Sequence, residues 1–246
     1  DGLMRQLTVH DVKWLTEAPV GKLARTLMDR GYSFDYISDA MLQQTKADRG
    51  GLATQGGRYK LIVVPATRRM PAATLQRLNQ LAADGATVVF EKLPEDVNGF
   101  GRLEARRAEF KAALAKVAPA AVPADLFATL ASRNIPREAI AETGVSFIRR
   151  ATTAGHDYFY TNLTGKKFEG WTPLGTATKA AAVLDPLTGA LGAAALKVPA
   201  GSGATQIYLQ LEPGQSLLVR TATNAIPSPG AKWPYREAAG AAAPIA

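Results

Sequence analysis

Residues 61–90 read LIVVPATRRMPAATLQRLNQLAADGATVVF, and this stretch decides the fold of the first half of the chain. Residues 61–64 form a continuous apolar run that ends at a proline, which is typical of a strand covered on both faces. Pro71 favours the first turn of a helix, and Gly85 favours its end. Residues 87–90 are a second apolar run. Strand, helix and strand in this order predict two parallel strands joined by a right-handed crossover.

The segment before this stretch continues the alternation. Apolar residues repeat every three or four positions over 20–28, which predicts a helix that Gly31 ends. Residues 32–37, YSFDYI, are β-prone and predict another strand. Ser38 or Asp39 would then cap the next helix.

Two further segments complete the predicted first domain. Residues 46–59 are polar and rich in glycine, so we expect a loop or a small hairpin there. A helix is predicted from about Arg102, with Phe110 on its apolar face. Helices alternating with strands over 20–118 predict an open parallel three-layer α/β domain. We interpret residues 1–19 as a segment that enters from an upstream domain.

The second half has a different pattern. Residues 119–143 are rich in Ala and Pro and are interpreted as a connector, with a short helix at 124–133. Short apolar runs punctuated by Gly, Pro and Asn then predict an antiparallel, β-sandwich-like domain over 144–224. The predicted strands cover 145–150, 157–162, 180–184, 193–198, 206–211 and 216–220. Residues 225–246 are interpreted as a linker or the start of a further module.

Composition excludes several classes of chemistry. Of the 246 residues 47% are hydrophobic, and none is cysteine, so a thiolate nucleophile and a Cys-ligated metal are excluded. His10 and His156 are too few for a His-rich metal site. The net charge is +8, but the basic residues form separated clusters, and we expect no nucleic-acid partner. Every apolar run is too short to span a membrane.

The predicted carboxyl ends of the strands carry the first candidate site. Ligands of open α/β sheets bind at this edge, and here it would hold Asp39, Arg68, Arg69 and Glu91. These side chains suit a sugar or an anion, and two carboxylates such as Asp39 and Glu91 can hydrolyse a glycoside if their pKa values are divided. The structural alternative is that Asp39 caps a helix while Arg68 or Arg69 pairs with Asp39 or with Glu91, and nothing binds.

Aromatic residues of the second half form the other candidate site. Trp171 and the strip Tyr158, Phe159 and Tyr160 are candidates for stacking on sugars, although aromatic residues of a sandwich more often pack in its core or rim. A hydrolase or amidotransferase of the α/β type would need a nucleophile on a sharp turn after a strand, with a histidine base. The chain offers neither Cys nor a G-x-S-x-G motif.

Five segments, in this order over about 9–222, resemble glycoside hydrolase family 106, whose characterised members are α-L-rhamnosidases. They are RGYSFDYISDAML, YKLIVVPATRRMPAATLQRLNQLAADGATVVFEKLPEDVNGFGRLEARRAEF, GVSFIRRATTAGHDYFYTNL, AVLDPLTGALGAA and IYLQLEPGQSLLV. Each is weak alone, and their shared order carries the resemblance. The resemblance covers nearly the whole chain but only part of the family's protein.

The resemblance implies a larger enzyme. Proteins of that family begin with a catalytic (β/α)8 barrel, continue with a glutamine-amidotransferase-like α/β domain and end with β-rich modules. Their catalytic glutamates and calcium ligands lie in the barrel, and no position of this chain matches those motifs. The resemblance therefore implies no catalytic residue, metal or cofactor in this chain, a barrel of the same polypeptide as its partner, a rhamnose-containing glycoside as substrate, and a periplasmic or extracellular location.

These observations lead to one expected function and two alternatives. We expect an accessory region that braces the barrel and shapes the sugar cleft, with Asp39, Arg68, Arg69, Glu91 and Trp171 as candidate substrate contacts. A stand-alone carbohydrate-binding module that uses Trp171 is the first alternative. A degenerate amidotransferase-like enzyme that uses Asp39 and Glu91 is the second.

Overall fold

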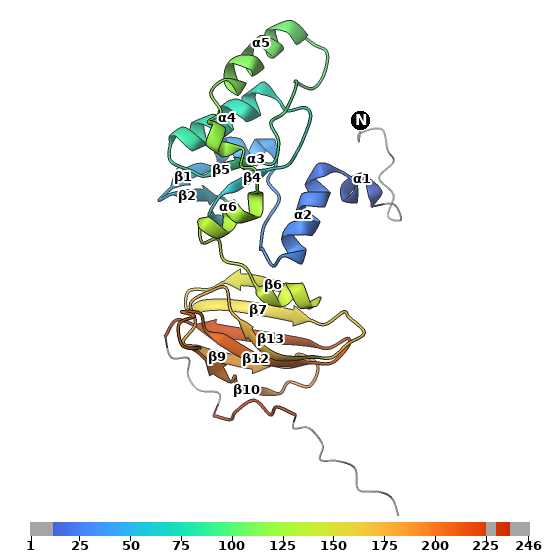
Figure 1. Ribbon diagram of the computed structural model, residues 1–246, viewed down its shortest axis with the longest axis vertical. Coiled ribbons are helices and arrows are strands. Elements are labelled where there is room, and N and C mark those ends of the chain that lie inside the picture. The colour runs from blue at the N-terminus through green and yellow to red at the C-terminus, as the bar shows by residue number, and fades with distance from the viewer. Residues whose placement is uncertain (1–11, 225–229, 237–246) are drawn as a thin grey trace, which may run out of the picture. The chain divides into compact units, whose positions relative to one another are not determined.

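The computed structural model describes residues 12–224 and 230–236 (Figure 1). It divides into two compact units. The first takes in residues up to Arg25 and Phe34–Ile135, and the second takes in Thr26–Ser33 and the residues from Pro136 onward. The division after Ile135 falls inside the segment 119–143. None of the helices in the described part of the chain is long and apolar enough to cross a membrane.

The first unit contains most of the helices, a parallel strand pair and a small antiparallel sheet. Its elements are α1 (Lys13–Thr16), most of α2 (Pro19–Asp29), α3 (Asp39–Gln44), β1 (Lys46–Asp48), β2 (Gly51–Thr54), β3 (Gly57–Tyr59), β4 (Ile62–Val64), α4 (Ala72–Ala83), β5 (Val88–Phe90), α5 (Leu103–Leu114), η2 (Pro119–Ala121) and α6 (Leu126–Ser132).

The parallel pair predicted from residues 61–90 is confirmed. β4 and β5 pair in parallel, with Ile62 opposite Val88 and Val64 opposite Phe90, and α4 connects them. Pro71 is the N-cap of α4, where its missing N–H costs nothing. Three leucines of α4, Leu75, Leu78 and Leu81, are buried in the core of this unit. The strand, helix and strand predicted from the local sequence pattern are therefore all present.

The predicted strand at 32–37 is wrong. Gly31 ends α2 with a φ of +81°, and Tyr32 is buried and makes one isolated antiparallel bridge to Arg137. The residues that follow belong to no strand, and the side chains of Tyr36 and Ile37 are 57% and 38% exposed. β-Prone residues form a strand only where they find a paired edge and a packed face, and beyond Tyr32 the segment has neither.

The glycine-rich segment 46–59 forms more structure than a loop. β1, β2 and β3 make a three-stranded antiparallel sheet, with Ala47 opposite Leu52 and Leu52 opposite Tyr59. Leu52 is buried in the core of the first unit. The small hairpin predicted for this segment is therefore present, and a third strand is added to it.

The second unit is antiparallel throughout its two main sheets. Its elements are η3 (Ala139–Thr143), β6 (Ser146–Ala151), β7 (Gly155–Thr161), β8 (Phe168–Pro173), β9 (Ala180–Leu184), β10 (Leu191–Ala193), β11 (Leu196–Lys197), β12 (Gln206–Leu211) and β13 (Ser216–Ala222). One sheet has the order β10-β9-β13-β7-β6, and the other has the order β11-β12-β8.

One apolar core is shared by both sheets of the second unit. Tyr158 and Tyr160 of β7 and Val219 of β13 enter it from the larger sheet, and Ile207 and Leu209 of β12 enter it from the smaller one. β7 and β13 alternate buried and more exposed positions over most of their length, as expected for a strand with one face on a core. The sequence pattern missed β8, whose Gly and Pro interrupt the apolar alternation.

Residues 230–236 lie against both sheets. Lys232 makes a parallel bridge to Ala193, and Trp233 packs against the shared core. Arg236 donates its backbone N–H to the Gln210 side chain at 2.7 Å. The described part of the segment 225–246 is therefore bound to this unit, while residues 225–229 and 237–246 lie outside the described residues, as do residues 1–11 of the predicted incoming segment 1–19.

Candidate functional sites

The loops that follow β4 and β5 run side by side in the first unit. The backbone N–H groups of Glu95 and Asp96 donate to the Arg68 carbonyl, and Met70 donates back to the Asp96 carbonyl at 3.0 Å. Glu91, the first residue after β5, accepts a hydrogen bond from the Ala66 N–H at 3.1 Å. The carboxyl ends of the two strands thus continue into one hydrogen-bonded loop pair.

Charged side chains of this loop pair form exposed ion pairs. Arg68 Nε lies 3.1 Å from Glu95 Oε2, and Lys92 Nζ lies 2.9 Å from Glu95 Oε1. Hydrogen bonds from Lys92 and then Arg68 lower the pKa of Glu95. Because the Arg68 side chain is 83% exposed, water screens these pairs and they contribute little to stability.

Asp96 makes a bidentate ion pair in this region, which no local sequence pattern predicts. Its two carboxylate oxygens accept from Arg107 Nε at 3.0 Å and Nη2 at 2.7 Å, which ties the loop to α5. These bonds lower the pKa of Asp96 to about 2. Arg69, predicted as a site residue, forms an isolated bridge with Asp96 through the backbone. The carboxylate is therefore a structural anchor of the loop.

Asp39 occupies a different position from the one expected. The side chain of Ser38 caps α3 by accepting from the Met41 N–H at 3.3 Å, and Asp39 follows in the first turn, where its charge suits the helix dipole. Since residues 32–37 form no strand, Asp39 does not stand at the carboxyl end of one. In the described ranges no hydrogen bond or ion pair joins Asp39 to Arg68, Arg69 or Glu91. Three of the four predicted edge residues come together, and Asp39 is not joined to them.

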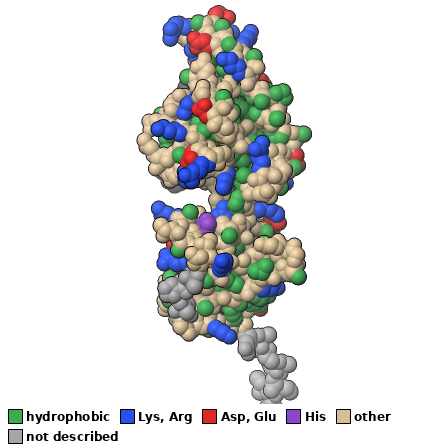
Figure 2. Space-filling model, turned by 90° about the vertical axis from the view of Figure 1, so that its left-hand side faces the viewer, with side chains coloured by type: hydrophobic (Ala, Val, Ile, Leu, Met, Phe, Trp, Pro, Cys, Tyr) green, Lys and Arg blue, Asp and Glu red, His purple; other side chains and the backbone are tan. Residues whose placement is uncertain are grey.

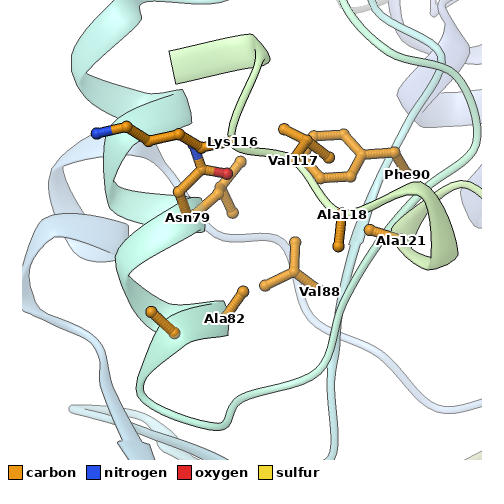
Figure 3. A pocket seen from close by; sticks show the side chains of 10 residues that line it. Asn79, Ala82, Val88, Phe90, Lys116, Val117, Ala118 and Ala121 are labelled. Atoms are coloured by element: carbon orange, nitrogen blue, oxygen red, sulfur yellow. The ribbon is translucent and has the colours of Figure 1, made fainter. Parts of the chain in front are cut away.

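The first unit also contains an apolar pocket of about 270 Å³ (Figure 3). Val88 and Phe90 of β5 line it together with Asn79 of α4 and Val117 beyond α5. Asn79 donates its side-chain amide to the Ala113 carbonyl at 2.7 Å, so this donor is already used. Figure 3 shows the Lys116 ammonium pointing away from the hollow. The pocket lacks the convergent polar groups that orient a polar ligand.

A second pocket of about 220 Å³ lies between the first turns of α4 and α5. Arg102 and Arg106 line it. The Arg106 guanidinium donates to three backbone carbonyls of the preceding loop, those of Asn98, Gly99 and Gly101. This arginine therefore holds the loop with three of its five N–H donors.

Two of the three residues in the expected aromatic strip of β7 are buried, and Phe159 between them is half-buried. Tyr158 and Tyr160 are both 0% exposed, and their rings stack on each other with centroids 5.4 Å apart. Burial raises the pKa of both hydroxyl groups. The two tyrosines belong to the core and cannot stack on a sugar, which corrects that part of the sequence interpretation.

A buried polar cluster surrounds these tyrosines, and sequence reasoning missed it. Glu138 is 0% exposed, and its Oε1 accepts from Arg149 at 2.5 Å and from the Tyr158 hydroxyl at 3.2 Å. Its Oε2 accepts from the Gly175 N–H at 3.0 Å. Three donors thus compensate the buried carboxylate, as a buried charge requires. Glu138 lies in the segment interpreted as a connector, where no pattern marks a buried acid.

Trp171 lies on the outward face of the smaller sheet. It is 38% exposed, whereas its neighbour Thr172 is buried. Tyr208 stands directly opposite it on β12, with ring centroids 5.3 Å apart, and Lys197 Nζ lies 4.2 Å from the indole centroid. Of the predicted sugar-stacking residues, Trp171 thus retains an accessible ring.

The carboxyl groups show a common electrostatic trend. Cationic or hydroxyl neighbours lower the pKa of four carboxyl groups in the described residues, those of Glu95, Asp96, Asp157 and Glu169. A general acid needs the opposite shift. In the described ranges no group of three or more His, Cys, Asp or Glu residues is arranged to hold a metal ion. Figure 2 shows the Lys and Arg side chains dispersed over the face in view.

Comparison with known proteins identifies relatives of this chain. The model of glycoside hydrolase family 106, described as alpha-L-rhamnosidase, matches residues 9–197. Among solved structures, the rhamnosidase from Novosphingobium sp. PP1Y matches with a TM-score of 0.65 and 18% sequence identity, over 84% of this chain and 21% of that one. At that identity the likeness is one of fold. The chain spans about a fifth of the length of that rhamnosidase. No curated protein sequence matches the chain.

Proposed function

The chain belongs to the α-L-rhamnosidases of glycoside hydrolase family 106, and from this premise we propose that it is an accessory, non-catalytic region of a larger rhamnosidase-like glycoside hydrolase. The observation that carries the proposal is the coverage: 84% of this chain corresponds to 21% of a rhamnosidase. The lowered pKa values of its carboxyl groups add support, because none of the shifted groups is poised to protonate a leaving oxygen at neutral pH.

In this proposal the two units have separate architectures. The first is an amidotransferase-like α/β layer structure built around the β4 and β5 pair, without a nucleophile. The second is a β-sandwich, supported by the core that its two sheets share. The catalytic glutamates and calcium ligands would lie in a barrel of the same polypeptide, as the family resemblance implies. The two units would brace that barrel and shape its cleft for a rhamnose-containing glycoside in a periplasmic or extracellular setting.

The experiment is release of p-nitrophenol from p-nitrophenyl α-L-rhamnoside. We would compare the 246-residue chain with a form extended upstream through the proposed barrel. We expect turnover by the extended form alone. Hydrolysis by the short chain would refute the accessory role, and Glu91, Arg69 and Asp39 would then be the first residues to substitute.

A second function is favoured by one observation, the accessible indole of Trp171. An exposed aromatic ring on a rigid sheet suits carbohydrate binding, either in the larger enzyme or in a stand-alone module. This reading differs from a pure scaffold because it predicts saccharide binding by the chain itself.

A further inference from the structure

We propose that the outward face of the sheet formed by β8, β11 and β12 is a saccharide-binding site, in which the indole of Trp171 stacks on a sugar ring and the carboxylate of Glu169 accepts a sugar hydroxyl. The inference rests on the proposed function only for the source of the sugar, a glycan of the larger enzyme's substrate. The site itself is argued from the geometry of this face.

Strand alternation places the key side chains on one face. Trp171 and Glu169 are two residues apart on β8, and Tyr208 and Gln210 stand opposite them on β12. Residues two apart on a strand point to the same side of a sheet. The other side, represented by Ile207 and Leu209, is packed into the core. Trp171, Glu169 and Tyr208 therefore form one outward surface, and Gln210, which is only 5% exposed, supports Glu169 beside them.

The aromatic rings of this surface are held in place before any ligand arrives. The Tyr208 ring lies between Trp171, at 5.3 Å, and Tyr235, at 5.1 Å. The Tyr208 hydroxyl donates to Glu169 at 2.7 Å, and the Tyr235 hydroxyl donates to the Tyr208 carbonyl at 3.0 Å. A platform whose rings are already fixed loses little conformational entropy on binding.

Lys197 shows what kind of group the indole face attracts. Its ammonium lies 4.2 Å from the Trp171 ring centroid, in a cation–π arrangement. The C–H groups on the face of a sugar ring carry a weaker positive polarisation and suit the same negative ring face. Because Lys197 is exposed on a flexible stem, it can leave the ring and donate to a sugar hydroxyl.

Glu169 supplies the acceptor beside the platform. Its Oε1 accepts from Tyr208 at 2.7 Å and from Gln210 at 3.0 Å, and its Oε2 lies 2.5 Å from Lys167 Nζ. Hydrogen bonds from Lys167, Tyr208 and Gln210 lower its pKa to about 2, so it is an anion at neutral pH. A carboxylate has about four acceptor positions, and three donors leave room for one hydroxyl. The partly exposed carboxylate can therefore take a fourth donor from solvent or sugar.

The test is titration of the 246-residue chain with methyl α-L-rhamnoside, read by ¹H–¹⁵N NMR of its three indole N–H groups. A neutral glycoside is essential, because a chain of net charge +8 would bind an acidic polysaccharide by charge alone. Trp14 is the matched control, since its exposure of 41% is close to the 38% of Trp171 but it lies on α1 without the Tyr and Glu partners. Methyl α-D-glucoside, titrated in parallel, reports whether the site prefers the 6-deoxy sugar.

We expect a saturating shift of the Trp171 indole signal and little change at Trp14. Trp171→Ala should abolish binding, Trp14→Ala should leave it unchanged, and Glu169→Gln should weaken it about fivefold to tenfold by removing a charge-assisted hydrogen bond. Far-UV circular dichroism confirms that each variant is folded, and the conservative Glu169→Gln variant tests the site if Trp171→Ala unfolds.

Two results would overturn the proposal: no shift at Trp171 with either glycoside, or equal shifts at Trp171 and Trp14. Both are independent of hydrolysis by the extended form. The chain can therefore fail this test and still be an accessory region of a rhamnosidase, or pass it if the accessory role fails.

Discussion

Glu138 is the residue whose removal should destabilise the second unit most clearly. Its carboxylate is 0% exposed and satisfies Arg149, the Tyr158 hydroxyl and the Gly175 N–H. In Glu138→Ala all three donors lose this acceptor, and the guanidinium of Arg149, only 12% exposed, becomes an unpaired buried charge. Breaking a buried ion pair in this way costs about 3–5 kcal/mol. Because a domain is stable by only about 5–15 kcal/mol, the second unit should unfold at a much lower urea concentration.

The assay is urea unfolding of the second unit by tryptophan fluorescence. Trp171 and Trp233 lie in this unit, and Trp233 packs against its core. A Trp14→Phe background removes the indole of the first unit, so the transition reports the second unit alone. The double variant Glu138→Met, Arg149→Met should recover part of the loss, since it replaces the pair without leaving a buried charge.

The matched control is Asp157→Asn, which breaks the exposed pair with Arg220 in the same unit. We expect this change to leave the stability of the chain nearly unchanged. If Glu138→Ala lowers the stability of the second unit no more than Asp157→Asn, burial is not what makes the Glu138 pair important. The reasoning would also fail if the double variant were less stable than Glu138→Ala alone.

The remaining predictions concern both units. Gly31→Ala should lower the free energy of unfolding, measured in urea, more than Gly85→Ala does. Both glycines have a positive φ, +81° and +93°, but a Cβ at Gly31 would lie 2.1 Å from the Glu138 carbonyl oxygen. A Cβ at Gly85 would meet nothing within 4 Å. Equal losses of stability in the two variants would show that only the strain of the positive φ matters and that the close contact at Gly31 does not. Leu75→Ala, at a side chain that is 0% exposed, should cost about 2–5 kcal/mol through the cavity it leaves, and a loss below that of an exposed substitution would contradict the core assignment. Asp96 has a folded-state pKa of about 2, below its ordinary value, so its contribution is present above that ordinary value and is lost as the pH falls toward 2. Asp96→Asn should therefore flatten the loss of stability between about pH 4 and pH 2, and an unchanged acid profile would refute the anchor role.

Local pattern was sufficient for some elements of the fold and failed for others. β4, α4 and β5 follow from an apolar run, a proline and a glycine within 30 residues, because each signal acts on its own neighbourhood. The segment 32–37 has the same β-prone composition, but a strand also needs a partner edge, which no local signal reports. β8 was missed for the opposite reason: pairing with β12 overrides its Gly and Pro.

The same distinction explains which site residues could be found. Glu91 follows β5 directly, and Arg68 and Arg69 lie in the loop after β4, so the parallel pair places all three on one hydrogen-bonded loop pair. The partnership of Asp96 with Arg107 depends on where α5 packs, and that of Glu138 with Arg149 depends on how η3 meets β6. Such pairs form only when separate elements pack together in the tertiary structure, and residue type alone cannot distinguish a buried acid from a solvated one.

The pKa values of the acidic side chains bear on whether this chain is suited to bind a sugar or to hydrolyse a glycoside. Hydrolysis by two carboxyl groups needs one of them protonated near neutral pH, which requires burial or a neighbouring anion. Here the neighbouring Lys, Arg and Tyr donors lower the pKa of Glu95, Asp96, Asp157 and Glu169 and so favour their anionic forms. An anion fixed beside an exposed indole, as Glu169 is beside Trp171, is suited to accept a hydroxyl and unsuited to donate a proton. The electrostatics that support the proposed accessory role of these units are therefore the same ones that favour the proposed sugar contact on the β8 and β12 face.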